Sequence, residues 1–152
     1  MAEAYYWLFR IAEVEKDWDG MELAIQRATV LDPANSDYHL RFSNVLKRLK
    51  KLERAEKEAT LAIQHSAAPS PWLFNHRAWI RWGLKDYTGA VHDWQASIRL
   101  APRKAVFYAQ AAEAYIQLGE WAKAASYYQK VIDLEPENKG YQKRYGELKT
   151  NS

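Results

Sequence analysis

The fold is decided by one stretch, residues 105–136, whose sequence is AVFYAQAAEAYIQLGEWAKAASYYQKVIDLEP. Two segments with apolar residues at helical spacing lie on either side of a short polar turn at Gly119 and Glu120. Pro136 follows the second segment and marks its end, because proline cannot continue a helix. The stretch therefore predicts two helices joined by a tight turn.

The proline stop after the second helix recurs along the chain. Pro102 and Pro136 end two such stops, which lie 34 residues apart. Pro33 ends an earlier stop, and a looser one ends at Pro69. Self-similarity at a period of this length indicates tandem helical repeats. The period predicts four repeats, and these are residues 2–35, 36–70, 71–104 and 105–138.

Small residues recur at two positions in the second half of each predicted repeat. An aromatic residue or Leu follows the polar turn, and Ala or Met comes three residues later. Side chains of this size let two helices approach closely. The first position is occupied by Met21, Ala55, Ala90 and Ala124, and the second, seven residues further on, by Ala28, Ala62, Ser97 and Val131.

The stretch at 105–136 is similar almost throughout to the consensus of the tetratricopeptide repeat family, and the four copies extend the resemblance over residues 2–138. The second copy departs most from the pattern, because Ser43 and Lys47 lie in its first helix and its turn has no glycine. The resemblance implies an all-α fold, a right-handed superhelical solenoid of helix-turn-helix repeats. One helix pair cannot bury its apolar face alone, so neighbouring pairs are expected to stack into a continuous core.

A C-terminal segment follows the predicted repeat domain. Tyr141, Tyr145 and Leu148 lie at helical spacing, with charged residues on the other sides. An apolar stripe of this kind can pack on the last repeat and close the stack. We therefore expect residues 139–152 to be a capping helix and tail.

The residue types present exclude several kinds of chemical site. The chain has no cysteine, which excludes disulfides and thiolate metal sites and is compatible with either the cytoplasm or the periplasm. Its four histidines fall on different predicted helices, and it has no glycine-rich phosphate loop and no serine in a nucleophile elbow. The longest uncharged run, residues 59–76, contains Pro69 and Pro71 and cannot span a bilayer. We expect no catalysis, no cofactor, no bound metal and no membrane insertion by this segment.

Charge is unevenly distributed along the chain, although its net charge is only +3. The first and fourth predicted repeats are acidic, and the second and third are basic. This basic middle, flanked by acidic segments, favours an acidic or mixed-charge protein partner over a general polyanion such as nucleic acid. A basic run at residues 47–54 is either an anion-binding patch or a solvated turn between helices.

An aromatic stripe lies on the first predicted helix of the third repeat. The stripe consists of Trp72, His76, Trp79 and Trp82. In tetratricopeptide proteins the first helix of each repeat lines a concave groove, so the resemblance implies that the stripe faces a partner. Two alternatives stay open. The tryptophans belong to the core, or the helix is rotated so that Arg77 and Arg81 face the groove instead.

The other first helices supply further groove positions. Trp and Arg carry most of the energy at protein interfaces, and Asn can both donate to and accept from a peptide backbone. The candidate partner-binding residues implied by the resemblance are Tyr6, Arg10, Arg41, Asn44, Arg48, Trp72, Asn75, His76, Trp79, Trp82, Gln110 and Glu113. Aromatic residues at other repeat positions are expected in the core, and these are Trp18, Tyr87, Trp94, Trp121 and Tyr128.

One class of tetratricopeptide co-chaperones grips the C-terminal carboxylate of chaperone tails with a clamp of Lys, Asn and Arg side chains across three repeats. At the matching places this sequence has Tyr6 and Arg10, then Arg41, then Trp72 and His76. A register one repeat later gives Leu40 and Asn44, then His76, then Val106 and Gln110. Neither register restores the clamp, so we expect no binding of chaperone tails.

The sequence therefore predicts a monomeric protein–protein interaction scaffold that binds a peptide or helix of a partner in its concave groove. Two other functions stay open as alternatives. In the first, the chain would be a soluble repeat appendage of a larger enzyme or membrane protein. In the second, it would be an RNA-binding helical repeat whose Arg and aromatic side chains stack on bases. The Asp-Pro and Glu-Pro stops and the acidic first and fourth repeats argue against RNA.

Overall fold

The computed structural model describes residues 1–150, which form nine α-helices and no strand. Asn151 and Ser152, the end of the predicted tail, lie outside the described residues. The helices are α1 (Ala2–Glu15), α2 (Trp18–Leu31), α3 (Ser36–Arg48), α4 (Leu52–His65), α5 (Pro71–Gly83), α6 (Tyr87–Leu100), α7 (Ala105–Gln117), α8 (Trp121–Leu134) and α9 (Lys139–Thr150).

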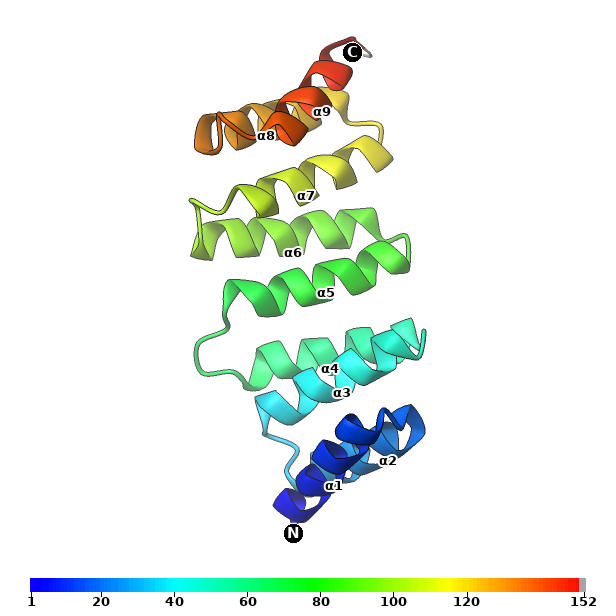
Figure 1. Cartoon of the computed structure of the whole chain (residues 1–152). Helices are drawn as coiled ribbons and strands as arrows, with labels where there is room; N and C mark the ends of the chain where they lie inside the picture. The colour runs from blue at the N-terminus through cyan, green and yellow to red at the C-terminus, as the bar shows by residue number, and fades with distance from the viewer. Residues whose placement is uncertain (151–152) are drawn as a thin grey trace. The chain divides into compact units, whose positions relative to one another are not determined.

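The first eight helices form four hairpins, each within one of the residue ranges expected from the period (Figure 1). α1 packs on α2, α3 on α4, α5 on α6, and α7 on α8. Only two or three residues separate the helices of a hairpin, a connection that makes them antiparallel neighbours. The prediction of an all-α fold built from repeated helix pairs is confirmed.

One residue in each hairpin turn has a left-handed backbone. The φ angles are 58° at Lys16, 61° at Lys50, 62° at Lys85 and 73° at Gly119. This conformation costs side-chain-bearing residues free energy that glycine does not lose, so the fourth turn is the least strained. In two hairpins an aspartate then caps the second helix, since Asp17 accepts from Gly20 N at 3.0 Å and Asp86 from Gly89 N at 2.9 Å.

The two recurrent small positions lie in the interior of every hairpin. Met21 is 5% exposed, and all the other members are completely buried. The alanines and Ser97 are small enough to allow the second helix of each pair to approach its neighbours closely. The completely buried members are Ala28, Ala55, Ala62, Ala90, Ser97, Ala124 and Val131.

The chain consists of two compact units, and the boundary falls between the second and third hairpins. The first unit is Met1–Pro69, with α1 to α4, and the second begins at Ser70, with α5 to α9. Within the first unit α2 also packs on α3, and within the second α6 packs on α7 and α8 on α9.

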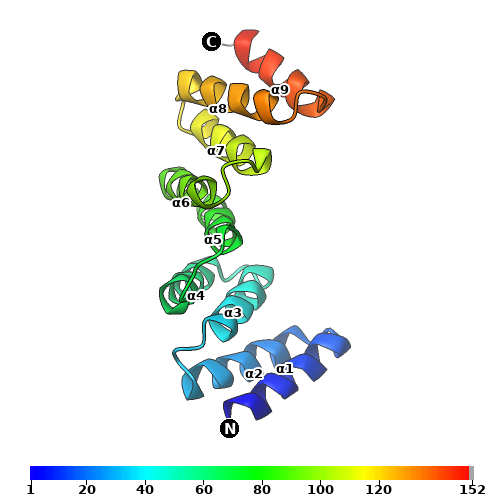
Figure 2. The ribbon, with the colours of Figure 1, turned by 90° about the vertical axis from the view of Figure 1, so that its left-hand side faces the viewer.

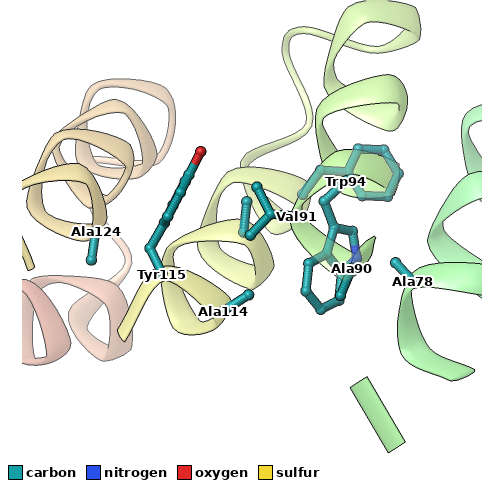
Figure 3. Close-up of a cluster of buried hydrophobic side chains, with 9 residues drawn as sticks. Ala78, Ala90, Val91, Trp94, Ala114, Tyr115 and Ala124 are labelled. Atoms are coloured by element: carbon teal, nitrogen blue, oxygen red, sulfur yellow. The ribbon is translucent and has the colours of Figure 1, made fainter. Parts of the chain in front are cut away.

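The core of the second unit is built around Trp94, its largest fully buried side chain. Trp94 clusters with Phe107 and with small residues from four helices, so the large rings fill the space that the alanines leave (Figure 3). The cluster consists of Ala78, Ala90, Val91, Trp94, Phe107, Ala111, Ala114, Tyr115 and Ala124.

The capping helix α9 packs on α8 at the C-terminal end of the second unit (Figure 2). Leu148 is 3% exposed and joins a cluster with Tyr128 and Val131. Tyr141 and Tyr145 are half-buried against the same cluster. The predicted apolar stripe therefore does face the last repeat.

Two of the aromatic residues expected in the core are more than one third exposed, and for them the prediction is wrong. Trp18 is 37% exposed and Trp121 is 40% exposed. Each is the first residue of its helix, directly after the hairpin turn, so only part of its ring reaches the space between helices. Trp94 and Tyr128 are buried as expected, and Tyr87 is half-buried.

Candidate functional site

Helix α5 presents the tryptophans of the aromatic stripe on its surface. Trp72 is 54% exposed and Trp79 is 41% exposed, whereas Ala78 and Ile80 are completely buried. Trp82 is half-buried. The exposure of Trp72 and Trp79 excludes the alternative that these two rings are buried in the core.

Trp79 is held from beneath by other aromatic rings. Its ring lies edge-on against Trp94, with the centroids 5.4 Å apart and an interplanar angle of 81°, and it meets Trp82 at 5.9 Å. Trp94 is itself fixed by a hydrogen bond of 3.0 Å from its Nε1 to Asn75 Oδ1. One side of Trp79 is therefore ordered by packing while the other remains available to solvent.

The arginines of α5 point away from this surface. Arg77 and Arg81 both bind the carboxylate of Asp93 on α6, which is completely buried. Arg81 Nη1 also donates to Gly89 O at 3.4 Å. Their side chains are only 12% and 19% exposed. The alternative of a rotated helix, with these arginines facing a partner, is therefore excluded.

A pocket of about 230 Å³ lies beside Trp79, between α5, α7, α8 and α9. It brings together Trp79, Trp82, Gln110 and Glu113 from the predicted site. Trp72 instead packs edge-on against Phe107, with ring centroids 5.0 Å apart. The residues that line the pocket are Trp79, Trp82, Val106, Ala109, Gln110, Glu113, Gln117, Tyr128 and Tyr141.

The charge of Glu113 is balanced from the capping helix. Arg144 Nε and Nη2 donate to its two carboxylate oxygens at 2.7 and 2.8 Å, and Tyr128 OH donates at 2.6 Å. Burial alone would raise the pKa of Glu113, but these hydrogen bonds outweigh it and lower the pKa below its usual value. The pKa of Tyr128 is raised mainly by burial and secondly by its hydrogen bond to Glu113.

Within the first unit, two predicted site residues meet. The Arg41 guanidinium lies 5.3 Å from the centroid of the Tyr6 ring, and the Tyr6 ring stacks on Tyr38 at 5.4 Å. Arg41 Nε also donates to Asp37 at 2.7 Å. A cation held over an aromatic face in this way forms a compact polar-aromatic surface.

The remaining predicted partner-binding residues of the first unit lie on its surface, where each contacts a nearby residue. Arg10 pairs with Glu13 at 3.3 Å. Asn44 Nδ2 donates to the carbonyl oxygen of Leu40 in its own helix at 3.1 Å. Arg48 lies 5.4 Å from the centroid of the exposed Trp18 ring.

Sequence reasoning missed an apolar surface on α1. Trp7 is 67% exposed, Leu8 52%, Ile11 55% and Val14 82%. Two of these positions, Trp7 and Val14, correspond in the fourth repeat to polar Gln110 and Gln117. A comparison of the repeat copies position by position could have found this difference.

It also missed a pair of histidines in the first unit. The His39 and His65 rings stack with centroids 5.5 Å apart, and His39 Nδ1 lies 2.7 Å from Glu58 Oε2. These residues are far apart in the sequence and lie on different helices, so no local spacing signals the contact.

Among residues 1–150 no group of three or more His, Asp or Glu side chains could hold a metal ion. No helix in that range is long and apolar enough to cross a membrane.

Comparison with known proteins identifies the repeat and the fold. Residues 105–138 match the family model for the tetratricopeptide repeat. No curated protein sequence matches the chain. Three solved structures illustrate the likeness of fold.

MamA from Desulfovibrio magneticus RS-1, solved from residue 41 to its end, is similar with a TM-score of 0.85 at 17% identity, over 99% of this chain and 84% of the solved chain. YrrB, described as a TPR protein with an unusual peptide-binding site, has a TM-score of 0.82 at 14% identity, over 99% of this chain and 77% of its own. The first TPR domain of Spaghetti (RPAP3), bound to an HSP90 peptide, has a TM-score of 0.67 at 20% identity, over 76% of this chain and 91% of its own. The predicted resemblance is therefore confirmed: residues 105–138 are a tetratricopeptide repeat, and the whole chain has the fold of the tetratricopeptide-repeat proteins.

Proposed function

We propose that this chain is a protein–protein interaction scaffold and that the second unit binds a peptide or helix of a partner over the exposed surface of α5 and α7. The observation that carries this proposal is the state of Trp79. The residue is 41% exposed, yet its ring packs against Trp94 and Trp82 beside a pocket. An exposed ring that is already ordered loses little conformational entropy when a partner covers it.

Residue chemistry supports the same interpretation. Trp is among the residue types that dominate binding energy at protein interfaces, and such residues are most effective beside a pocket that water leaves on binding. Two proteins of similar fold also handle peptides: YrrB is described with a peptide-binding site, and the Spaghetti domain was solved with a bound peptide. Binding without catalysis is the function that these observations favour.

The partner is expected to differ from a chaperone tail. The clamp for a terminal carboxylate needs free cationic side chains, but Arg77 and Arg81 are committed to Asp93. In the first unit Arg41 is paired with Asp37 and covers Tyr6. We propose that Tyr6, Arg41 and the neighbouring exposed Arg10, Asn44 and Arg48 offer a separate contact surface for a partner of mixed charge.

Selection from a phage-displayed library of random dodecapeptides tests the proposal. Peptides selected on the wild-type chain are synthesised, and their dissociation constants are measured for the wild type, Trp79→Ala and Trp121→Ala. Trp121 is the matched control, because this residue is 40% exposed but lies outside the pocket. We expect Trp79→Ala to weaken binding and Trp121→Ala to leave it unchanged. Equal effects of the two substitutions, or no selected peptide at all, would contradict the proposal.

A further inference from the structure

We propose that the pocket beside Trp79 takes one uncharged aromatic side chain of the partner, and that Gln110 Oε1 accepts a hydrogen bond from an N–H group on that side chain or on the main chain next to it. This inference rests on the proposed function and names the chemistry that the site selects. It follows from the size of the pocket, its charge, its one unpartnered acceptor and the rings in its wall.

The size of the pocket fits a single ring system. Its volume of about 230 Å³ exceeds that of an engineered apolar cavity of about 150 Å³ that binds benzene. Val106 and Ala109 on α7 form an aliphatic wall, and Trp79 and Trp82 on α5 form an aromatic one. A ring as large as indole therefore has room, and its faces meet apolar surface.

The charge of the pocket disfavours ionised side chains. Glu113 lines the pocket, but both of its carboxylate oxygens are bound by Arg144. A Lys or Arg side chain of the partner would have to compete with Arg144 for it. None of the described residues that line the pocket is Lys or Arg, so a carboxylate would leave water without a cation to replace it. The electrostatically complementary side chain is therefore uncharged.

Gln110 supplies a specific polar contact. Its Oε1 is the one buried side-chain polar atom without a hydrogen-bond partner among residues 1–150. Buried acceptors in folded proteins nearly always have a donor, so an atom of this kind beside a pocket indicates a donor on the ligand. The same unit already contains such a pair, because Asn75 Oδ1 accepts from the indole Nε1 of Trp94 at 3.0 Å.

The ring geometry favours an aromatic over an aliphatic occupant. Trp94 packs edge-on against Trp79 at 5.4 Å on one side of that ring. Trp82 meets Trp79 edge-on at 5.9 Å, and both rings line the pocket, so an aromatic occupant can extend this group of edge-to-face contacts. Edge-to-face pairs of rings are more favourable than their buried area alone predicts.

The test uses the selected dodecapeptides and the intact chain. In each peptide the residue whose replacement by Ala weakens binding most is identified and then replaced by Phe, Trp, Leu, Glu and Lys. We expect that residue to be aromatic and its replacement by Ala, Glu or Lys to weaken binding about thirtyfold or more. Gln110→Leu should weaken binding by the best peptide about tenfold. Gln64→Leu is the control, since Gln64 is an exposed glutamine that lies outside the pocket.

The outcomes separate this inference from the proposed function. Peptides that need Trp79 but accept Glu or Lys at the critical position would overturn the inference and leave the proposed function standing. Equal affinities for the wild type and Gln110→Leu would overturn it in the same way. If no peptide is selected, or Trp79→Ala binds as well as the wild type, the proposed function fails and the inference fails with it. Melting curves of both glutamine variants verify that the fold is unchanged.

Discussion

Arg77 holds the carboxylate of Asp93 through two parallel hydrogen bonds, from Nε to Oδ2 at 2.9 Å and from Nη2 to Oδ1 at 2.7 Å. Arg81 adds a third contact of 3.1 Å to the same carboxylate. These bonds join α5 to α6 and fix the rotation of α5. Because both arginines turn inward to a buried acid, Trp79 on the same helix faces outward. The buried ion pair therefore determines which side chains α5 exposes.

Removal of Asp93 is expected to destabilise the second unit strongly. Asp93→Ala leaves two arginines largely buried without their anion, and loss of one partner of a buried ion pair costs about 3–5 kcal/mol. Denaturant unfolding of the variant measures this cost. Thr88→Ala is the control, because Thr88 is exposed on the same helix, and its replacement should change stability by less than about 0.5 kcal/mol. Equal stabilities of the two variants would show that the ion pair does not anchor α5.

The hairpin turns predict opposite effects for two substitutions. Gly119→Ala should lower the free energy of unfolding by about 1–2 kcal/mol, because φ is 73° there and an added Cβ would meet no neighbouring atom within 4 Å. The loss would therefore come from the backbone alone. Lys85→Gly, at a φ of 62°, should be neutral or stabilising by up to about 1 kcal/mol. Melting temperatures of the two variants and the wild type measure both effects. A Gly119→Ala variant as stable as the wild type, together with a destabilised Lys85→Gly variant, would contradict the prediction.

Features that depend on local or repeated sequence patterns could be predicted, whereas contacts between residues far apart in the sequence could not. The period, the small residues such as Ala124 and the stripe on α5 are repeated or local patterns, and they predicted the helix pairs and the exposure of Trp79. The bond between Glu113 and Arg144 joins residues 31 positions apart, on helices whose relative placement no local spacing specifies. The inward turn of Arg77 likewise depends on Asp93 in the next helix. For Trp18 and Trp121 the repeat pattern gives a position but does not indicate how much of the ring the hairpin turn leaves uncovered.

Overpacking at Ala124 tests the phase of the repeats. Ala124 is completely buried in the cluster around Trp94, so Ala124→Leu should destabilise the chain by about 1–3 kcal/mol. The control is Ala122→Leu, two residues earlier on the exposed side of α8. An unchanged denaturation midpoint for Ala124→Leu would show that this position does not mediate close helix packing.

The free energy of unfolding should fall at acidic pH because Glu113 becomes protonated. The bonds from Arg144 and Tyr128 lower its folded pKa below the ordinary value of 4.5, so its stabilisation is present above that pH and is lost as the pH falls through the folded pKa. Denaturant unfolding of the wild type and Glu113→Gln, from neutral pH to about pH 3, measures the effect. The wild-type advantage should shrink in the acidic part of this range, and an advantage that is independent of pH would contradict it.

The role of Trp79 as the anchor of the partner is tested by one substitution measured in two ways. Trp79→Ala is compared with Trp94→Ala, whose ring is completely buried, in both peptide affinity and denaturant unfolding. Trp94→Ala should cost about 3–5 kcal/mol of stability. Trp79→Ala should cost clearly less stability, since its ring is 41% exposed, but should weaken peptide binding by about 2 kcal/mol or more. A Trp79→Ala variant that binds the selected peptides as tightly as the wild type would contradict the proposed anchor.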